Sequence, residues 1–259
     1  MDYQSFLATK AITAVGSGRD VAPDEIHVSL FPFQRRIVTW ACRRGRAAVF
    51  ADTGLGKTRM QIEWARLMGS RALILAPLAV AEQTVREAAV LGVAARYCRT
   101  PADRQAGEIA VTNYDRLDAW ADESVDAVVL DESSILKSFT GATRRALITR
   151  FADTPHRLCC TATPAPNDYL ELGNHAQFLG IMSWTEMAAT FFVHDTQSDD
   201  GDRGENASGW RLKGHAAHDF WRWLATWGVY VRKPSALGDD DTAYALPPLE
   251  IRDATVPWG

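Results

Sequence analysis

The sequence predicts an α/β protein in which a mostly parallel sheet carries helices on both faces. Five short apolar runs recur along the chain, and longer stretches with the apolar spacing of helices separate most of them. The runs are residues 47–50, 72–75, 109–111, 127–130 and 157–160. Strands that are apolar on both faces are typical of a parallel sheet covered on both sides. Ligands collect at the carboxyl ends of such strands, so we expect functional residues in the loops that follow these runs.

Composition limits the class of protein. Hydrophobic residues make up 47% of the 259 residues and charged residues 23%, as in an ordinary globular protein. A net charge of -4 gives no bulk electrostatic reason to expect nucleic acid as a partner. No apolar run approaches the ~20 residues of a membrane span, and the N-terminus lacks the layout of a secretory signal. We therefore expect a cytoplasmic protein with no membrane partner.

Cysteine and histidine usage gives no support for a metal or disulfide framework. The four cysteines show neither a C-x-x-C spacing nor a paired pattern, so we expect reduced thiols in a core. His194, His215 and His218 lack a fourth ligand at a suitable spacing, which argues against a zinc site built from them.

A phosphate-binding loop follows the first apolar run. Residues 51–58 read Ala-Asp-Thr-Gly-Leu-Gly-Lys-Thr and precede a predicted helix over 59–68, with Ala51 in place of the first glycine of the generic pattern. Glycines let backbone N–H groups turn toward phosphate oxygens, and the helix presents its positive N-terminal end. Lys57 is expected to contact the β- and γ-phosphates of ATP, and the Thr58 hydroxyl to ligate Mg²⁺. The predicted ATP-binding residues of this loop are Thr53, Gly54, Leu55, Gly56, Lys57 and Thr58.

Two carboxylates follow the apolar run that ends at Leu130. Asp131 and Glu132 therefore lie where a phosphate-loop enzyme places its acidic residues, about 75 residues after the loop. We predict that Asp131 holds Mg²⁺, most simply through water, and that Glu132 orients and deprotonates the attacking water. Lys57, Asp131 and Glu132 are thus the predicted catalytic residues.

These motifs resemble those of superfamily-2 helicases and translocases of the Swi/Snf-like kind, which are related to DEAD/DEAH-box proteins. Residues 51–58 resemble motif I, and 131–134 resemble motif II, with two serines where the familiar form has Ala-His. Residues 161–164, Thr-Ala-Thr-Pro, look like motif III, and 166–179 resemble the Swi/Snf-like continuation N-x-x-x-E-L leading into F-L. The resemblance covers about residues 30–180 and implies a RecA-like P-loop NTPase lobe that binds ATP and Mg²⁺.

The resemblance also implies roles for residues outside the ATP loop. Gln34, which follows Leu-Phe-Pro-Phe, matches the glutamine that reads the adenine edge in the family. Thr161 and Thr163 match the hydroxyl residues that link the ATP site to the nucleic-acid face. The roles of all three residues are expectations that the resemblance implies.

Two further loops match motifs Ia and Ib, which touch the sugar-phosphate backbone of one strand in the family. Contact of this kind is independent of sequence and needs no large net positive charge. Lys137 matches a family lysine near the tracking groove, although a solvated helix lysine is an alternative interpretation. The residues predicted to contact nucleic acid are Pro77, Leu78, Thr112, Asn113 and Lys137.

The expected domain organisation has three parts. Residues 1–29 form a lead-in packed on the lobe, 30–233 form the RecA-like lobe with a mobile loop at about 195–210, and 234–259 form an exit linker toward a second RecA-like lobe that this chain lacks. An apolar stripe at helical spacing predicts a helix docked on the core, with base stacking as the alternative. The stripe consists of Phe220, Trp223, Leu224, Trp227 and Val231.

The function that the resemblance implies is ATP hydrolysis coupled to movement on DNA. Duplex DNA is favoured and RNA is not excluded, and the second lobe is expected in cis or in trans. Two alternatives stay open: a non-motor ATP-dependent module that binds nucleic acid or protein, and a motor subunit of a restriction- or defence-type complex. Residues 167–178 and 210–215 are similar to helicases encoded by bacteriophages, which implies the cytoplasm of a bacterial or phage-infected cell.

Overall fold

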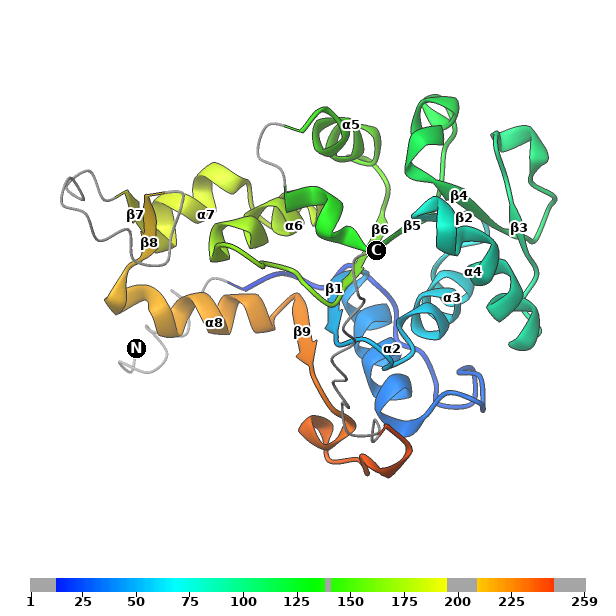
Figure 1. The fold of residues 1–259 in the computed structure, drawn as a ribbon, viewed down its shortest axis with the longest axis horizontal. Coiled ribbons are helices and arrows are strands. Elements are labelled where there is room, and N and C mark those ends of the chain that lie inside the picture. Colours follow the sequence, from blue (N-terminus) through cyan, green and yellow to red (C-terminus); the bar gives the residue numbers. More distant parts are fainter. Residues whose placement is uncertain (1–12, 138–140, 195–208, 245–259) are drawn as a thin grey trace, which may run out of the picture.

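A seven-stranded sheet with every neighbouring pair parallel forms the centre of the computed structural model, which describes residues 13–137, 141–194 and 209–244 (Figure 1). The strand order is β3-β4-β2-β5-β6-β1-β9. The strands are β1 (Arg46–Ala51), β2 (Ala72–Ala76), β3 (Ala95–Tyr97), β4 (Ile109–Asn113), β5 (Ala127–Asp131), β6 (His156–Thr161) and β9 (Gly228–Val231). A small antiparallel pair joins β7 (Phe192–His194) to β8 (Trp210–Leu212). The predicted α/β class is confirmed.

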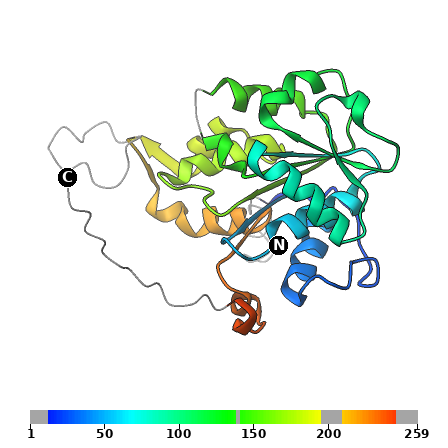
Figure 2. The same cartoon turned by 45° about the vertical axis from the view of Figure 1, so that its right-hand side comes forward.

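Helices cover both faces of the sheet, as Figures 1 and 2 show. The α-helices are α2 (Pro32–Arg44), α3 (Lys57–Met68), α4 (Leu78–Val90), α5 (Ala142–Arg150), α6 (Leu172–Leu179), α7 (Trp184–Phe191) and α8 (Ala217–Ala225). Shorter 3₁₀ segments are η1 (Pro101–Asp103), η2 (Tyr114–Trp120), η3 (Ser133–Lys137), η4 (Tyr169–Glu171), η5 (Gly214–Ala216), η6 (Pro234–Leu237) and η7 (Thr242–Tyr244). Helices α2, α3 and α4 pack on one face, and α6, α7 and α8 pack on the other.

Successive side chains of a strand point to opposite faces of the sheet, and here both faces are covered by helices. The apolar runs therefore form strands that are buried on both faces. Val49 packs in the core under α2 to α4, whereas its neighbour Phe50 packs in the core under α6 to α8. Leu73 and Ile74 of β2 divide between the two cores in the same way. Each of these side chains is at most 2% exposed, so a strand in this sheet needs apolar residues at consecutive positions.

One predicted helix is wrong at its C-terminal end. The stripe that ends at Val231 was expected to be helical throughout, but α8 ends at Ala225 and residues 228–231 form the edge strand β9 beside β1. Trp227 O accepts a hydrogen bond from Ala48 N at 2.8 Å, which starts the pairing. The free edge of β1 therefore determines the conformation here, and it overrides the helical spacing of the apolar residues.

The described part of the N-terminal segment contacts α2 and α3, and that of the C-terminal segment contacts α2. In the N-terminal segment, Arg19 N donates to Cys42 O at 3.0 Å, and His27 N donates to Glu63 Oε1 at 2.7 Å. On the C-terminal side, Arg36 forms an ion pair of 2.8 Å with Asp239. Residues 1–12 and 245–259, and most of the expected loop at 195–210, lie outside the described residues. Among the helices that are described, none has the length and apolar character to cross a membrane.

Candidate functional site

The predicted phosphate loop lies at the carboxyl end of β1 and leads directly into α3. Gly54 and Gly56 have φ angles of 83° and 75°, which is the left-handed region that glycine adopts most readily. Lys57 begins α3, and its Nζ donates to Ala51 O at 2.8 Å and to Asp52 O at 3.2 Å, which places the amine across the mouth of the loop. No side chain caps the first amides of α3 in the described structure. Uncapped amides and a lysine amine are the groups that hold a phosphate, so these residues fit the triphosphate of ATP.

Gln34 joins the N-terminal segment to this loop. Its Nε2 donates to Leu55 O at 2.9 Å, and its Oε1 accepts a hydrogen bond from Phe31 N at 3.0 Å. The side chain is only 2% exposed. In this conformation Gln34 therefore holds the loop in place, and contact with an adenine edge requires it to become more accessible than it is here.

The contact between Gln34 and the loop predicts unequal effects of two alanine substitutions. Gly56→Ala would place a Cβ 2.4 Å from Gln34 Nε2, whereas a Cβ at Gly54 would have no heavy atom within 4 Å. Positive φ costs either alanine about 1 kcal/mol. At Gly56 alone the end of the Gln34 side chain must also move and give up its hydrogen bond to Leu55 O, which adds about 0.5–1.5 kcal/mol. We expect chemical denaturation to show a larger loss of stability for Gly56→Ala than for Gly54→Ala. Equal losses would contradict the close approach, and in a Gln34→Ala background the extra loss at Gly56 relative to Gly54 should disappear.

The acidic pair lies at the carboxyl end of β5, facing the loop. Gln61 Nε2, from α3, donates to Asp131 Oδ1 at 2.7 Å, and Tyr114 Oη donates to Asp131 O at 2.6 Å. Burial raises the pKa of Asp131, and the nearby ammonium of Lys57 is among the influences that lower it. The structure therefore brings Lys57 and Asp131 to one site from two different strand ends. The Thr58 hydroxyl on α3 and the Asp131 carboxylate are oxygen ligands of the kind that Mg²⁺ prefers.

Glu132 adopts an unusual backbone conformation and connects motifs II and III. Its φ is 53°, a region that non-glycine residues seldom occupy. Its Oε1 accepts hydrogen bonds from Ser134 Oγ at 2.7 Å and from Thr161 Oγ1 at 2.6 Å. Thr163 N in turn donates to Thr161 Oγ1 at 3.0 Å, so Thr163 takes part through its backbone. Ser134 is one of the two serines that replace Ala-His of the familiar motif II, and its hydroxyl donates to the carboxylate of Glu132.

A groove of about 360 Å³ brings together most of the residues that were predicted to contact nucleic acid. Its lining consists of Pro77, Leu78, Asn113, Tyr114, Asp115, Glu132, Ser134, Ile135 and Lys137. Leu78 is 62% exposed, and Lys137 is exposed at the end of η3. Because Glu132 also lines this groove, a bound polymer would lie close to the acidic site.

One residue of the predicted nucleic-acid set, Thr112, is corrected by its burial, and a second, Asn113, is nearly buried. Thr112 is 0% exposed, and its Oγ1 has no hydrogen-bond partner among the described residues. Asn113 is 3% exposed; its Nδ2 donates to Asp115 Oδ2 and its Oδ1 accepts from Tyr97 Oη. The Thr112 side chain cannot contact a phosphate in this conformation, because β4 packs it inside the sheet. Asn113, the last residue of β4, lines the groove, but its amide is already bonded to Tyr97 and Asp115.

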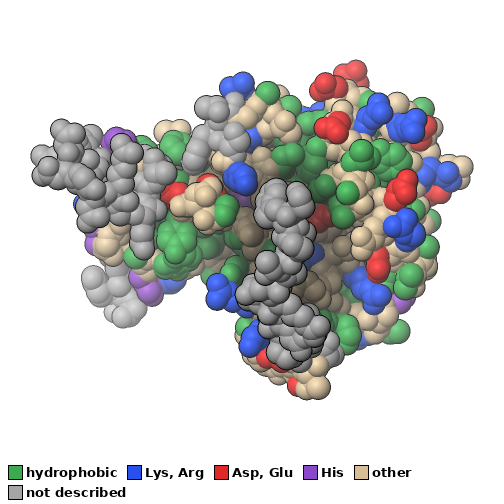
Figure 3. Space-filling model, in the orientation of Figure 1, with side chains coloured by type: hydrophobic (Ala, Val, Ile, Leu, Met, Phe, Trp, Pro, Cys, Tyr) green, Lys and Arg blue, Asp and Glu red, His purple; other side chains and the backbone are tan. Residues whose placement is uncertain are grey.

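Charge is mixed across the face shown in Figure 3. Lysine and arginine side chains are scattered among acidic ones and do not form a single basic stripe. The groove itself holds Lys137 together with Asp115 and Glu132. Binding of a polyanion here would depend on local contacts, which agrees with the net charge of -4.

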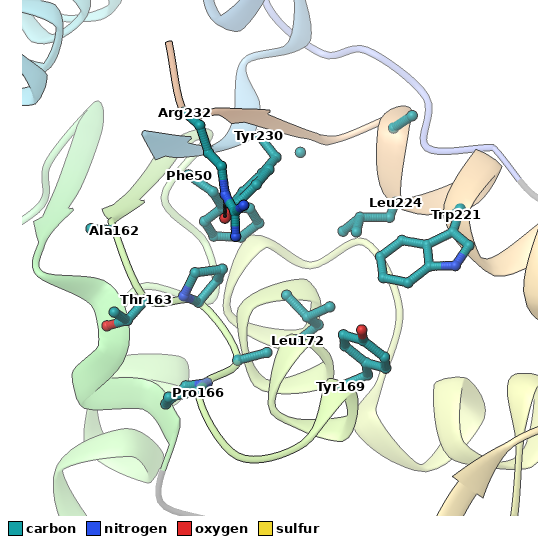
Figure 4. A pocket seen from close by; sticks show the side chains of 14 residues that line it. Phe50, Ala162, Thr163, Pro166, Tyr169, Leu172, Trp221, Leu224, Tyr230 and Arg232 are labelled. Carbon is teal, nitrogen blue, oxygen red and sulfur yellow. Dashed lines mark hydrogen bonds between the residues drawn. The ribbon is translucent and has the colours of Figure 1, made fainter. Parts of the chain in front are cut away.

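A second hollow, of about 590 Å³, lies beside Thr163 and was not predicted from the sequence. Figure 4 shows Tyr169, Trp221 and Tyr230 around it, with Arg232 lying over Tyr230. The Arg232 guanidinium carbon is 5.8 Å from the centre of the Tyr230 ring. The three aromatic side chains come from η4, α8 and β9, and residues 162–166, which include part of the predicted motif III, complete the wall. Among the described residues, no group of three or more His, Cys, Asp or Glu side chains gathers to hold a metal ion.

Sequence comparison finds relatives among DNA annealing helicases. The chain is 27% identical over 194 residues to the DNA annealing helicase and endonuclease ZRANB3 of Bos taurus, which covers 66% of this chain and 18% of that protein. It is 28% identical over 165 residues to the Mus musculus protein of the same name, covering 56% and 15%. The chain thus spans less than a fifth of the length of these relatives. No family model matches the chain.

A solved structure shares the fold. The SWI2/SNF2 ATPase core of Sulfolobus solfataricus in complex with dsDNA superposes with a TM-score of 0.65 at 17% identity, over 84% of this chain and 48% of that one. At this identity the likeness concerns the fold alone. The chain therefore has the RecA-like fold found in a SWI2/SNF2 ATPase core, and its sequence is similar to that of DNA annealing helicases.

Proposed function

We propose that the chain is the ATP-binding lobe of a DNA-dependent motor ATPase of the Swi/Snf-like kind. One observation carries the proposal: the loop with Lys57 and the pair Asp131–Glu132 meet at the carboxyl ends of β1 and β5, where Gln61 joins α3 to Asp131. The sequence similarity to DNA annealing helicases and the fold shared with a dsDNA-bound ATPase core support it.

In this proposal each residue has a defined task. The loop amides and Lys57 hold the β- and γ-phosphates, while Thr58 and Asp131 hold Mg²⁺, which would neutralise charge that develops on the phosphate oxygens. Glu132 orients the attacking water and accepts its proton, and Thr161 holds the Glu132 carboxylate in place. Thr163 and the groove residues Leu78 and Lys137 would carry the response to DNA.

A second RecA-like lobe, in the same polypeptide or from another chain, would complete the site. In related motors that lobe supplies arginine side chains worth about 10³–10⁵ in rate. We therefore propose that the chain alone binds Mg-ATP and hydrolyses it slowly. Movement along duplex DNA without strand separation is the activity that we propose for the complete motor.

Lys57→Ala tests the proposed function. The variant loses charge-assisted hydrogen bonds to phosphate of about 1.5–3 kcal/mol, so we expect Mg-ATP affinity to fall roughly tenfold to a hundredfold. Binding and single-turnover hydrolysis are measured with no nucleic acid, duplex DNA, single-stranded DNA or RNA. Arg59→Ala is the matched control, because Arg59 lies two residues farther into α3 and pairs with Glu87 at 3.1 Å. Equal ATP affinity in wild type and Lys57→Ala would overturn the assignment of the loop, and stimulation by RNA alone would overturn the preference for DNA.

A further inference from the structure

The short segment η3 connects two parts of the candidate site. Glu132 immediately precedes it, and Lys137 ends it on the wall of the 360 Å³ groove. A 3₁₀ segment of this length has poor internal hydrogen bonding, so its conformation depends on the residues that pack against it. The backbone at Glu132 is also in the left-handed region, which persists only where the surroundings enforce it. Whatever holds η3 therefore holds the Glu132 carboxylate.

Two consecutive residues of α6 contact the two ends of η3. His175 Nε2 lies 3.2 Å from Ser133 Oγ, and Asn174 Nδ2 donates to Lys137 O at 3.4 Å. Both α6 side chains are 0% exposed. Burying polar side chains costs free energy unless they make hydrogen bonds, and apolar residues would otherwise suit this face of a core helix. The contacts with η3 satisfy His175 Nε2 and Asn174 Nδ2, whereas His175 Nδ1 has no hydrogen-bond partner among the described residues.

The two α6 residues are themselves fixed from other elements. The Phe50 ring of β1 meets the His175 ring edge-on, with centroids 5.4 Å apart and an interplanar angle of 87°. Arg144 Nη1, from α5, donates to Asn174 Oδ1 at 2.8 Å. Burial lowers the pKa of His175 to about 4, so the ring is neutral near pH 7. The contact with Ser133 is consequently a neutral hydrogen bond that rigid elements hold on both sides.

We propose that Asn174 and His175 are positioning residues for Glu132, acting through η3. They keep the Glu132 carboxylate within hydrogen-bond distance of Thr161 and keep Lys137 on the groove. This inference rests on the proposed function, because it assigns Glu132 to ATP hydrolysis. It goes beyond that function because it names α6 as the helix that holds η3 and, through η3, Glu132.

His175→Leu removes the hydrogen bond to Ser133 and keeps an apolar side chain of similar size in the core. Displacing a catalytic group by about 1 Å costs roughly a hundredfold in rate, so we expect single-turnover hydrolysis to fall about tenfold to a hundredfold. The Kd for Mg-ATP should stay within about threefold, because the phosphate loop is untouched by this change. His175→Gln, which carries an amide that can reach Ser133, should restore most of the rate. Ser133→Ala combined with His175→Leu should be no slower than His175→Leu alone, since both remove one contact.

Hydrogen–deuterium exchange supplies a readout that needs no ATP. Exchange of the amides at 132–137 should be faster in His175→Leu and near wild type in His175→Gln, with the amides at 53–58 unchanged in both. If wild type neither binds nor hydrolyses ATP, the proposed function fails, and the exchange experiment still decides whether α6 holds η3. A hydrolysis rate within about twofold of wild type in His175→Leu, or equal behaviour of the Leu and Gln variants, would overturn the inference. Asn174→Asp, which keeps an acceptor for Arg144 and loses the donor to Lys137 O, should speed exchange in the same segment.

Discussion

Glu132→Gln is expected to reduce ATP hydrolysis by about 10²–10⁴-fold, which is the usual contribution of a positioned general base. Glutamine has nearly the same size as glutamate and can still accept hydrogen bonds from Ser134 and Thr161, so the loop should stay in place. It cannot take a proton from water. The affinity for Mg-ATP should therefore change little, in contrast to Lys57→Ala, which acts on binding.

The measurement is a single-turnover hydrolysis rate together with a nucleotide Kd for each variant. Glu171→Gln is the matched control, because Glu171 is also buried in the motif region, at 4% exposed, and accepts a hydrogen bond from Asn167. We expect Glu171→Gln to keep most of the hydrolysis rate. A rate for Glu132→Gln that equals that of the control would rule out Glu132 as the general base, and loss of ATP binding in Glu132→Gln would show a disturbed site.

The parts of the fold that the sequence predicts are those determined locally. A strand buried on both faces requires a continuous apolar run, and a phosphate loop requires glycines at positions with positive φ, so both leave a pattern that can be read residue by residue. Strand β3 has no such apolar pattern in the sequence, because its three residues are only half-buried. Strand β9 was hidden because its residues continue the apolar spacing of α8, and its conformation depends on pairing with β1.

The candidate site shows the same division. Lys57, Asp131 and Glu132 follow strands and could be identified from their positions in the sequence. The burial of Thr112 could not be predicted from the sequence, because it depends on how far β4 extends before its loop begins. The contact of His175 with Ser133 spans 42 positions in the sequence and has no local signature. The hollow beside Thr163 is likewise built from segments that meet only after the chain has folded.

Arg157→Met is expected to lower the free energy of unfolding by about 3 kcal/mol, because it leaves two buried carbonyl groups without a partner. Arg157 lies in β6 and is 3% exposed. Its guanidinium donates to Thr154 O at 2.9 Å, to Phe178 O in the last turn of α6, and to Ala152 O. Burial, followed by the charge of Arg46, lowers the pKa of Arg157 to about 10. Loss of the buried charge offsets part of the cost of leaving Thr154 O and Phe178 O unpaired, at about 1–3 kcal/mol each, whereas Ala152 is exposed and its carbonyl can bind water.

Arg46→Met provides the control for this prediction. Arg46 is the register partner of Arg157 on the neighbouring strand β1, but it is only half-buried, and its Nε donates to a single carbonyl, Pro155 O, at 3.1 Å. We expect a loss of about 1 kcal/mol for Arg46→Met. Urea unfolding of both variants, with unchanged m-values, measures the difference. Equal losses would mean that the guanidinium of Arg157 contributes no more than an ordinary surface hydrogen bond, and that α6 is held to the sheet by apolar packing alone.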